Sequence, residues 1–296
     1  KQKMLDNIGR RKMTNNISDK AYIGNNVTFK GNCVVEAGAR IGDNCYIDSN
    51  SIIRSGTTIG ANSFIGADCI IGEYLMDFCL DRRPHNHKLT IGNNALLRSG
   101  TIIYTGSEIG DHIQTGHRVT IREKSRIGSH CSIGTLSDIQ GNCSIGDYVR
   151  MHSNVHIGQL SVVDNYVWIF PYVVLTNDPT PPSEDEGFIG VHIHKFALIS
   201  TGSVLLPGVS IGRDALVGAC SNVTRDVSDY ALVVGNPAKQ IKDVRDMKNN
   251  NGENIYPWRF HFNRAMPWEK EGFMNWYRGL SDQSKFQYNV DENDIC

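Results

Sequence analysis

Histidine is the residue type in this chain whose chemistry can be placed most directly from spacing. His117 follows Thr115 by two positions, and Thr115 is a polar member of an otherwise aliphatic periodic series. An imidazole titrates near neutral pH and can take a proton from a nucleophile. We therefore expect His117 to act as the base and Glu123, one period later, to orient it. The alternatives are a surface histidine that bonds a backbone carbonyl and a solvated glutamate.

Two further histidines, His152 and His156, lie in a stretch expected to face outward and are secondary candidates. His112, His130 and Tyr148 are equally spaced along the chain. In a repeat structure, equal spacing places side chains above one another. We therefore predict that these three form a structural stack at one corner.

Asn177 and Asp178 open a loop that is rich in proline and acidic residues. Such a pair can bind the polar groups of a ligand, or it can start the loop through an Asx turn. Both interpretations remain open at this point.

The elements that position these residues follow from a period of six. Every sixth residue across 91–175 is Ile, Leu or Val, except Thr115 and Met151, and the same hexad series runs through 23–71 and 193–223. This period fits neither an α-helix nor a hairpin. It is typical of a hexapeptide-repeat parallel β-helix, in which short strands wind around a prism with the aliphatic residues inside. We predict three hexads per coil.

The series also defines the domain organisation. We predict a polar lead-in at 1–19, a β-helix at 20–241 with protruding loops at 73–89 and 176–191, and a C-terminal extension at 242–296. Loops added to a rigid repeat scaffold are where function concentrates.

The C-terminal extension is rich in aromatic residues, too rich for a disordered tail. We expect a short helix from about Pro267 to Leu280 that covers the open end of the prism or a neighbouring subunit.

Most of the cysteines have a packing role. Five of them, the interior cysteines, occupy the small position two residues before a hexad aliphatic: Cys33, Cys45, Cys69, Cys131 and Cys143. A buried thiol there behaves as a compact hydrophobe, and reduced thiols indicate a cytoplasmic protein. Cys79 and Cys296 are the candidates for reactive thiols.

The charge balance is close to neutral, with 30 basic and 31 acidic side chains, so nothing suggests nucleic acid or an anionic membrane as a partner. No apolar run approaches the ~18 residues of a membrane span. The polar start of the chain lacks the apolar core of a signal peptide.

The hexad series followed by Val-Gly-Asn-Pro-Ala-Lys at 234–239 resembles the left-handed β-helix acyltransferases that use acyl-CoA. The resemblance covers about residues 20–242. The segment Thr-Arg-Asp-Val at 224–227 and the ending that follows it are similar to the acetyltransferase branch. The segment Leu-Thr-Asn-Asp-Pro at 175–179 resembles N-acyltransferases that act on nucleotide-linked amino sugars.

The resemblance implies an all-β, left-handed parallel β-helix that forms homotrimers with active sites in the clefts between prisms. Outward aromatics such as Phe64, Trp168 and Tyr172 fit such an interface. The resemblance also implies transfer of an acetyl or other acyl group from acyl-CoA, with no metal required. The acceptor would be an amino sugar, nucleotide-linked, in the synthesis of cell-surface polysaccharides or antibiotic sugars.

The resemblance also assigns binding roles. It implies that Asn177 and Asp178 grip the sugar, with His152 and His156 nearby. For the co-substrate, it implies that the backbone amides of Gly202 and Ala219 bind the pantetheine. The side chains of Arg225 and Lys239 would bind the phosphates. The alternative for each basic residue is a solvated side chain.

Other functions remain open. The acceptor could be a sugar hydroxyl. His112 and His117 are five positions apart, which resembles two zinc ligands of the β-helix carbonic anhydrases, but a catalytic zinc needs three protein ligands and the counterpart position holds Met76. A non-catalytic scaffold is the third alternative.

Overall fold

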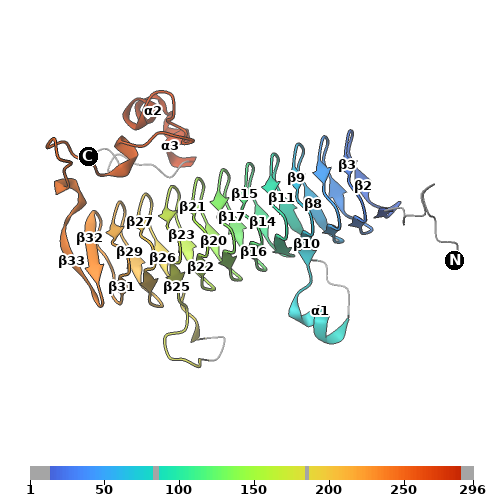
Figure 1. Cartoon of the computed structure of the whole chain (residues 1–296), viewed down its shortest axis with the longest axis horizontal. Helices are drawn as coiled ribbons and strands as arrows, with labels where there is room; N and C mark the ends of the chain where they lie inside the picture. Colours follow the sequence, from blue (N-terminus) through green and yellow to red (C-terminus); the bar gives the residue numbers. More distant parts are fainter. Residues whose placement is uncertain (1–13, 83–86, 184–186, 288–296) are drawn as a thin grey trace, which may run out of the picture. The chain divides into compact units, whose positions relative to one another are not determined.

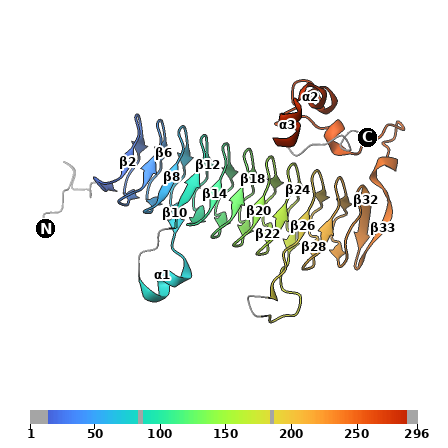
Figure 2. The same ribbon diagram turned by 180° about the vertical axis from the view of Figure 1, so that it is seen from behind.

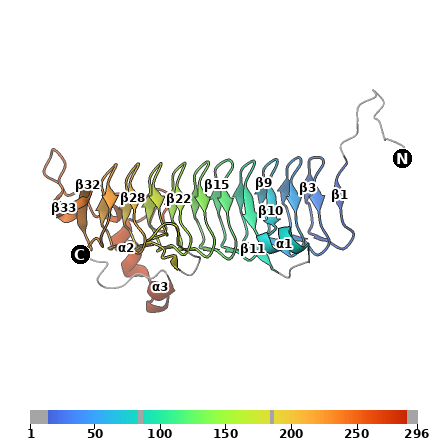
Figure 3. The same ribbon diagram turned by 90° about the horizontal axis from the view of Figure 1, so that it is seen from below.

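The computed structural model describes residues 14–82, 87–183 and 187–287. These fall into two compact units, Lys1–Ser125 and Arg126–Cys296, and each unit is described by itself. Each is a left-handed parallel β-helix with three hexads per coil, the fold class predicted from the hexad series. Within a unit, the strands of one sheet lie side by side in successive coils (Figure 1, Figure 3).

The hexad dictates a short strand and a tight corner. Most strands have two residues, the second of which is the buried aliphatic residue and the first of which faces outward. At many corners an asparagine adopts the left-handed conformation, as at Asn26, Asn44 and Asn62, with φ of 56°, 57° and 58°. Asparagine tolerates this conformation because its short polar side chain bonds locally. Strand and corner together use six residues.

Unit 1 contains three parallel sheets. The first is β1 (Asn16–Ile17), β4 (Val34–Val35), β7 (Ile52–Ile53), β10 (Ile70–Glu73), β13 (Ile102–Tyr104) and β16 (Thr120–Ile121). The second is β2 (Tyr22–Ile23), β5 (Arg40–Ile41), β8 (Thr57–Ile59), β11 (Leu89–Ile91) and β14 (Glu108–Ile109). The third is β3 (Thr28–Phe29), β6 (Tyr46–Ile47), β9 (Phe64–Ile65), β12 (Leu96–Leu97) and β15 (Gln114–Thr115). The first strand, β1, lies inside the stretch expected to be a polar lead-in.

Unit 2 repeats this arrangement. Its first sheet is β19 (Asp138–Ile139), β22 (His156–Ile157), β25 (Val174–Leu175), β28 (Val204–Leu205) and β31 (Asn222–Val223). Its second is β17 (Arg126–Ile127), β20 (Ser144–Ile145), β23 (Val162–Val163), β26 (His192–Ile193) and β29 (Ser210–Ile211). Its third is β18 (Ser132–Ile133), β21 (Arg150–Met151), β24 (Trp168–Ile169), β27 (Leu198–Ile199), β30 (Leu216–Val217), β32 (Ala231–Gly235) and β33 (Ala238–Asp243), and β33 runs antiparallel.

The register confirms the predicted interior. Ile103 pairs with Ile121 in unit 1, and Ile139 pairs with Ile157 in unit 2; all four side chains are completely buried. Burying an isoleucine side chain is worth roughly 1.5–3 kcal/mol. The repeated aliphatic position therefore provides most of the driving force for coil stacking.

The interior cysteines are buried as predicted. The thiol of Cys131 approaches the carbonyl of Gly146 at 3.0 Å, and burial raises the pKa of this thiol to about 12. Cys79 and Cys220 are exposed, and Cys296 lies outside the described residues.

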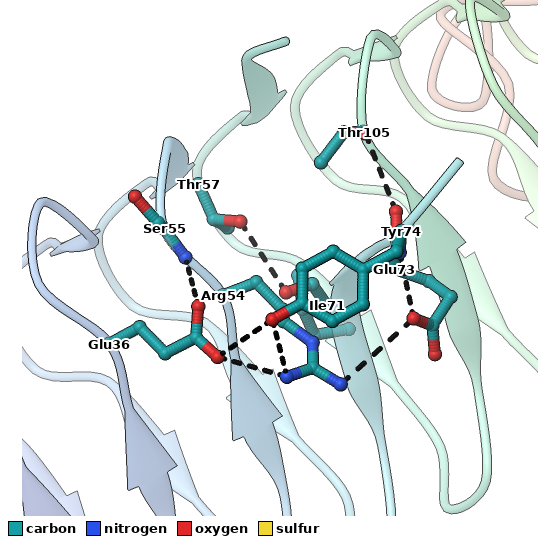
Figure 4. A network of polar contacts seen from close by, with 8 residues as sticks. All are labelled: Glu36, Arg54, Ser55, Thr57, Ile71, Glu73, Tyr74 and Thr105. Atoms are coloured by element: carbon teal, nitrogen blue, oxygen red, sulfur yellow. Dashed lines mark hydrogen bonds and ion pairs between the residues drawn. The ribbon is translucent and has the colours of Figure 1, made fainter. Parts of the chain in front are cut away.

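Two loops leave the coils where the series is interrupted. The first follows β10 and contains a short helix, α1 (Met76–Asp81). Figure 4 shows its base, where Tyr74 and Glu36 meet Arg54. The Arg54 guanidinium lies 2.9 Å from a Glu36 oxygen and donates to the Tyr74 hydroxyl at 3.0 Å, while the Glu73 carbonyl accepts from the Thr105 N–H at 3.1 Å. The loop is therefore fixed at its root to three neighbouring coils.

The second loop connects β25 to β26. It closes at its base, where the N–H of Ile189 donates to the carbonyl of Asn177 at 2.8 Å. Leu175 and Ile193 belong to consecutive strands of one coil, so the loop is a true insertion between two hexads.

The C-terminal extension differs from its expected placement. It contains the 3-10 helices η2 (Val244–Asp246) and η3 (Trp258–Phe260) and the helices α2 (Phe273–Gly279) and α3 (Asp282–Gln287). The helix thus begins at Phe273, after Gly272 at φ 78°, and not near Pro267. The helices lie alongside the coils of unit 2, and not beyond β33 (Figure 1, Figure 2).

Aromatic side chains at the corners of unit 2 explain this placement. Tyr148, Tyr166 and Phe196 have positive φ, and their rings stack in sequence at 5.4 and 5.0 Å. His130 stacks on Tyr148 at 4.6 Å, which confirms that part of the predicted stack. The buried rings of the extension pack against this row, so Trp268 lies 5.2 Å from Tyr166. A lateral apolar surface therefore attracts the extension.

One expectation about the surface is wrong. Trp168 does not form an open apolar face, because Trp258 and Phe262 of the extension lie 5.5 and 5.0 Å from its ring. Phe64 and Tyr172 remain 37% and 63% exposed.

A buried ion pair also attaches the extension. Asp214, in the coil after β29, pairs with Arg259 of η3, and both side chains have no exposed surface. The guanidinium lies over the rings of Phe196, Phe260 and Phe273 at 4.6, 4.8 and 5.2 Å.

Candidate functional site

The first sheet of unit 2 brings a histidine and a carboxylate together on its outer face. His156 in β22 is the register partner of Asp138 in β19, and both residues alternate with buried isoleucines. His156 Nδ1 lies 3.2 Å from Asp138 Oδ2, and the two side chains are 37% and 38% exposed. The pair is therefore held by the backbone register and open to solvent.

This pairing has a clear chemical consequence. When Nδ1–H of His156 donates to Asp138, Nε2 carries the lone pair and points away from the carboxylate. A carboxylate in this position selects the tautomer and stabilises the imidazolium that forms on protonation. An imidazole held in this way can accept a proton at Nε2, with the carboxylate fixing its orientation.

The second loop begins at the same coils. The carbonyl of Leu175 accepts from the N–H of Gly158 at 3.0 Å, which places the start of the loop beside the residue after Ile157. A methyl group added to Gly158 would lie 3.3 Å from Cβ of Asn177. Asn177 is therefore close in space to the coil that carries His156.

Asp178 takes part in the internal bonding of its loop. Its carboxylate accepts from the Ser183 N–H at 3.0 Å and the Thr180 N–H at 3.1 Å, and also from the Ser183 hydroxyl. These bonds, the Ser183 hydroxyl first, lower the pKa of Asp178 below its ordinary value. The geometry matches the Asx-turn interpretation, with Asp178 holding the loop that presents Asn177.

His117 and Glu123 belong to unit 1. His117 is an exposed corner residue after β15, and Glu123 accepts two bonds from its neighbour Arg122 at 3.1 and 2.9 Å. The polar residue in the series is satisfied inside the prism: the Thr115 hydroxyl lies 3.0 Å from that of Thr101. Thr115 therefore has a structural explanation that is independent of His117.

His152 lies at the corner that leads from β21 into β22. Its ring stacks on Phe170 with centroids 5.0 Å apart and an interplanar angle of 13°. The two histidines thus have different surroundings: exposed His152 stacks on a ring at a corner, and His156 faces outward beside a carboxylate.

The positions assigned to the co-substrate border the same sheet. Gly202 and Ala219 occupy the corner that leads into β28 and β31, in consecutive coils. The N–H of Gly202 already donates to the Pro171 carbonyl at 3.0 Å, so in this structure that donor is in use. Arg225 follows β31, Lys239 lies in β33, and both are exposed.

Two other features were not found from the sequence. A cavity of about 290 Å³ lies between the extension and the third sheet of unit 2. Its lining residues are Trp168, Phe170, Leu198, Ile255, Tyr256, Trp258, His261 and Phe262. The cavity is on a different sheet from His156, and we give it no part in the transfer chemistry.

The second feature is a possible metal-binding group. Among the described residues, the three potential ligands that lie close together are Asp164, His192 and His194. They belong to the second sheet of unit 2 and its corners. The pair His112 and His117 is exposed and is not part of this group.

Sequence reasoning missed Asp138, although the signal was present. Asp138 stands three hexads before His156, at the same outward position of the repeat. In a three-hexad coil, that spacing makes two residues direct neighbours. A search for carboxylates one coil away from each histidine would have found the pair.

Known families match the repeats. A model described as bacterial transferase hexapeptide (six repeats) matches residues 38–73 and 124–159, and one described as hexapeptide repeat of succinyl-transferase matches residues 20–55.

Individual relatives match parts of the chain. A chloramphenicol acetyltransferase of Klebsiella aerogenes is 37% identical over 82 residues, which is 26% of this chain and 39% of that protein. A dTDP-3-amino-3,6-dideoxy-alpha-D-galactopyranose 3-N-acetyltransferase of Aneurinibacillus thermoaerophilus is 50% identical over 54 residues, or 18% of this chain and 28% of that protein. The chain therefore spans less than half the length of these two curated relatives.

Among solved structures, LpxA from Acinetobacter baumannii aligns with 80% of this chain and 78% of that one, with a TM-score of 0.42 and 22% identity. Within the part of the chain that is described, no helix combines the length and the apolar character needed to cross a membrane.

Proposed function

We propose that this chain, whose repeats match hexapeptide transferase models, transfers an acyl group from acyl-CoA to the amino group of a nucleotide-linked sugar. The observation that carries the proposal is the Asp138–His156 pair on the first sheet of unit 2, beside the inserted loop. The 50% identity with a dTDP-amino-sugar N-acetyltransferase supports the choice of acceptor.

The residues support a direct transfer. The acceptor nitrogen attacks the thioester carbon, and His156 Nε2 takes the proton that the nitrogen loses. The tetrahedral intermediate then breaks its carbon–sulfur bond, and the imidazolium returns the proton to the departing CoA thiolate. The products are the N-acyl sugar and free CoA thiol, so His156 ends in its starting state. Asp138 stabilises the imidazolium between the two steps.

The residues proposed to bind the two substrates lie along the edges of the first sheet of unit 2. We propose that the pantetheine runs along the corner of Gly202 and Ala219, with Ala219 the available backbone donor. Arg225 and Lys239 are exposed cations that can make charge-assisted bonds to phosphates. Asn177 is proposed to contact the sugar, and Asp178 to keep the loop in shape.

The test compares three histidine-to-asparagine variants. CoA thiol release is measured with acetyl-CoA and a panel of dTDP- and UDP-linked amino sugars. His156→Asn is expected to lower kcat by about 10²- to 10⁴-fold, with little change in CoA affinity by calorimetry. His261→Asn, which alters an exposed histidine of the extension, is the matched control and should retain wild-type turnover.

His117→Asn tests the base expected from the sequence. If this variant loses turnover and His156→Asn keeps it, the base is His117 and the Asp138–His156 pair is structural. Asp138→Asn should give an intermediate loss, because it leaves the imidazole in place without its tautomer control.

The alternative acceptor is a sugar hydroxyl. The same assay includes hydroxyl-bearing sugars matched to the amino sugars, and turnover only with the hydroxyl set would assign O-acylation. A hydroxyl keeps its proton near neutral pH, so loss of the base should be more damaging for such a substrate.

We also infer a homotrimer, as the family resemblance implies. Light scattering gives the mass directly, and a monomer that retains full turnover would contradict this assembly.

A further inference from the structure

A second polar cluster lies on a different sheet of unit 2 and has no place in the transfer mechanism. His192 Nε2 is 3.2 Å from one oxygen of Asp164, and His194 Nδ1 is 3.3 Å from the other. The two imidazole centroids are 3.9 Å apart. All three potential ligand atoms lie within 4.8 Å of one another.

The register of the coils creates this convergence. The N–H of Asp164 donates to the Ile193 carbonyl at 2.8 Å, so the aspartate lies directly beside the residue that separates the two histidines. His192 faces outward from β26, and His194 starts the next corner. Their side chains are 42% and 38% exposed, and Asp164 is 22% exposed. The cluster is therefore accessible to an ion from solvent.

The separations suit a metal of the zinc class. Bonds of about 2.0–2.1 Å in a tetrahedron place neighbouring ligand atoms roughly 3.3 Å apart. Each imidazole nitrogen already lies at about this distance from one carboxylate oxygen, His192 from Oδ1 and His194 from Oδ2. With a single oxygen as the ligand, one side-chain rotation would bring the second imidazole to the same oxygen. Two nitrogens and one carboxylate oxygen are a ligand set that Zn²⁺ accepts, with the fourth position left for water.

A further residue fixes one of the ligands. The Ser210 hydroxyl lies 3.1 Å from His194 Nε2, the nitrogen that does not face Asp164. Metal-binding histidines commonly have their second ring nitrogen held by such a partner, which sets ring orientation. The arrangement thus has three ligands and an outer residue that orients one of them.

We propose that Asp164, His192 and His194 form a binding site for one divalent transition-metal ion, with Zn²⁺ or Co²⁺ as the expected occupants. On binding, the carboxylate exchanges its hydrogen bonds to the two imidazoles for coordination to the ion. The site lies on the second sheet, whereas His156 lies on the first, so the proposal does not depend on the proposed function and assigns the ion no catalytic step.

The test uses the full chain without a histidine tag, stripped with a chelator and titrated with Co²⁺. We expect one ion per chain, with the visible absorption of a low-symmetry cobalt site, followed by displacement with Zn²⁺. Outer-residue changes typically cost about 10–100-fold in metal affinity. His194→Gln and Asp164→Asn should therefore weaken binding by more than about 100-fold, and Ser210→Ala by about 10-fold.

Two controls make the result decisive. His261→Gln removes an exposed histidine of the extension and should leave affinity unchanged. The metal-free variants should melt at the wild-type temperature, and the near-isosteric Asp164→Asn guards against misfolding. No saturable binding at micromolar Co²⁺, or equal affinity in wild type and in both ligand variants, would overturn the proposal.

Discussion

Replacing Asp214 by asparagine should weaken the attachment of the C-terminal extension to unit 2. The change keeps the side-chain volume but removes the charge that balances Arg259, and both side chains are fully buried. Breaking a buried ion pair on one side typically costs about 3–5 kcal/mol, because the remaining charge is left uncompensated. The rings of Phe196, Phe260 and Phe273 still surround the guanidinium, so we expect the lower half of this range.

The assay is urea unfolding followed by intrinsic fluorescence. The tryptophans report on this region directly, because Trp258, Trp268 and Trp276 belong to the extension and Trp168 packs against it. The matched control is Asp243→Asn. Asp243 pairs with Arg245 at the surface, where such pairs contribute about 0–1 kcal/mol.

A double variant separates charge from packing. Arg259→Met combined with Asp214→Asn removes both charges and keeps an apolar side chain among the rings. Replacing a buried pair by apolar groups is often close to neutral, so the double variant should be more stable than Asp214→Asn alone. Equal unfolding midpoints for the Asp214 and Asp243 variants would refute the reasoning. A double variant that loses more unfolding free energy than the two single variants lose together would also refute it.

Four further results are expected. Ile139→Asp should lose at least about 4 kcal/mol and Gln140→Asp less than about 1 kcal/mol by thermal unfolding, because only the first buries an unpaired charge; similar melting temperatures would contradict the predicted interior. An alkylating reagent should modify Cys79 and Cys220 in the native protein and spare the interior cysteines until the protein unfolds. Burial raises the pKa of Cys131 from 9.0 to about 12, so the folded chain keeps a proton that the unfolded chain releases, and stability should fall as pH rises from 9 towards 12. Acyl transfer should survive chelation, and lost activity that returns with Zn²⁺ would favour a metal-dependent reaction.

The sequence determined the coil. A residue such as Ile157 recurs with a fixed period, and that local pattern alone decides which side chains face inward and which strands become neighbours. The same spacing predicts the contact between Asp138 and His156, because the two residues are three hexads apart with no insertion between them. The two loops were equally predictable, since each is an interruption of an otherwise regular series.

Only the tertiary structure decided the rest. Asp164 and His192 are neighbours across the inserted loop, and the insertion removes the simple spacing that would have paired them. The extension has no period, so its partners depend on which surface offers buried area. Asp214 and Arg259 meet because a row of stacked corner rings, from Tyr148 to Phe196, forms a lateral apolar surface that the extension covers. Periodic burial is encoded locally, whereas contacts between segments far apart in the chain depend on the free energy of the whole folded surface.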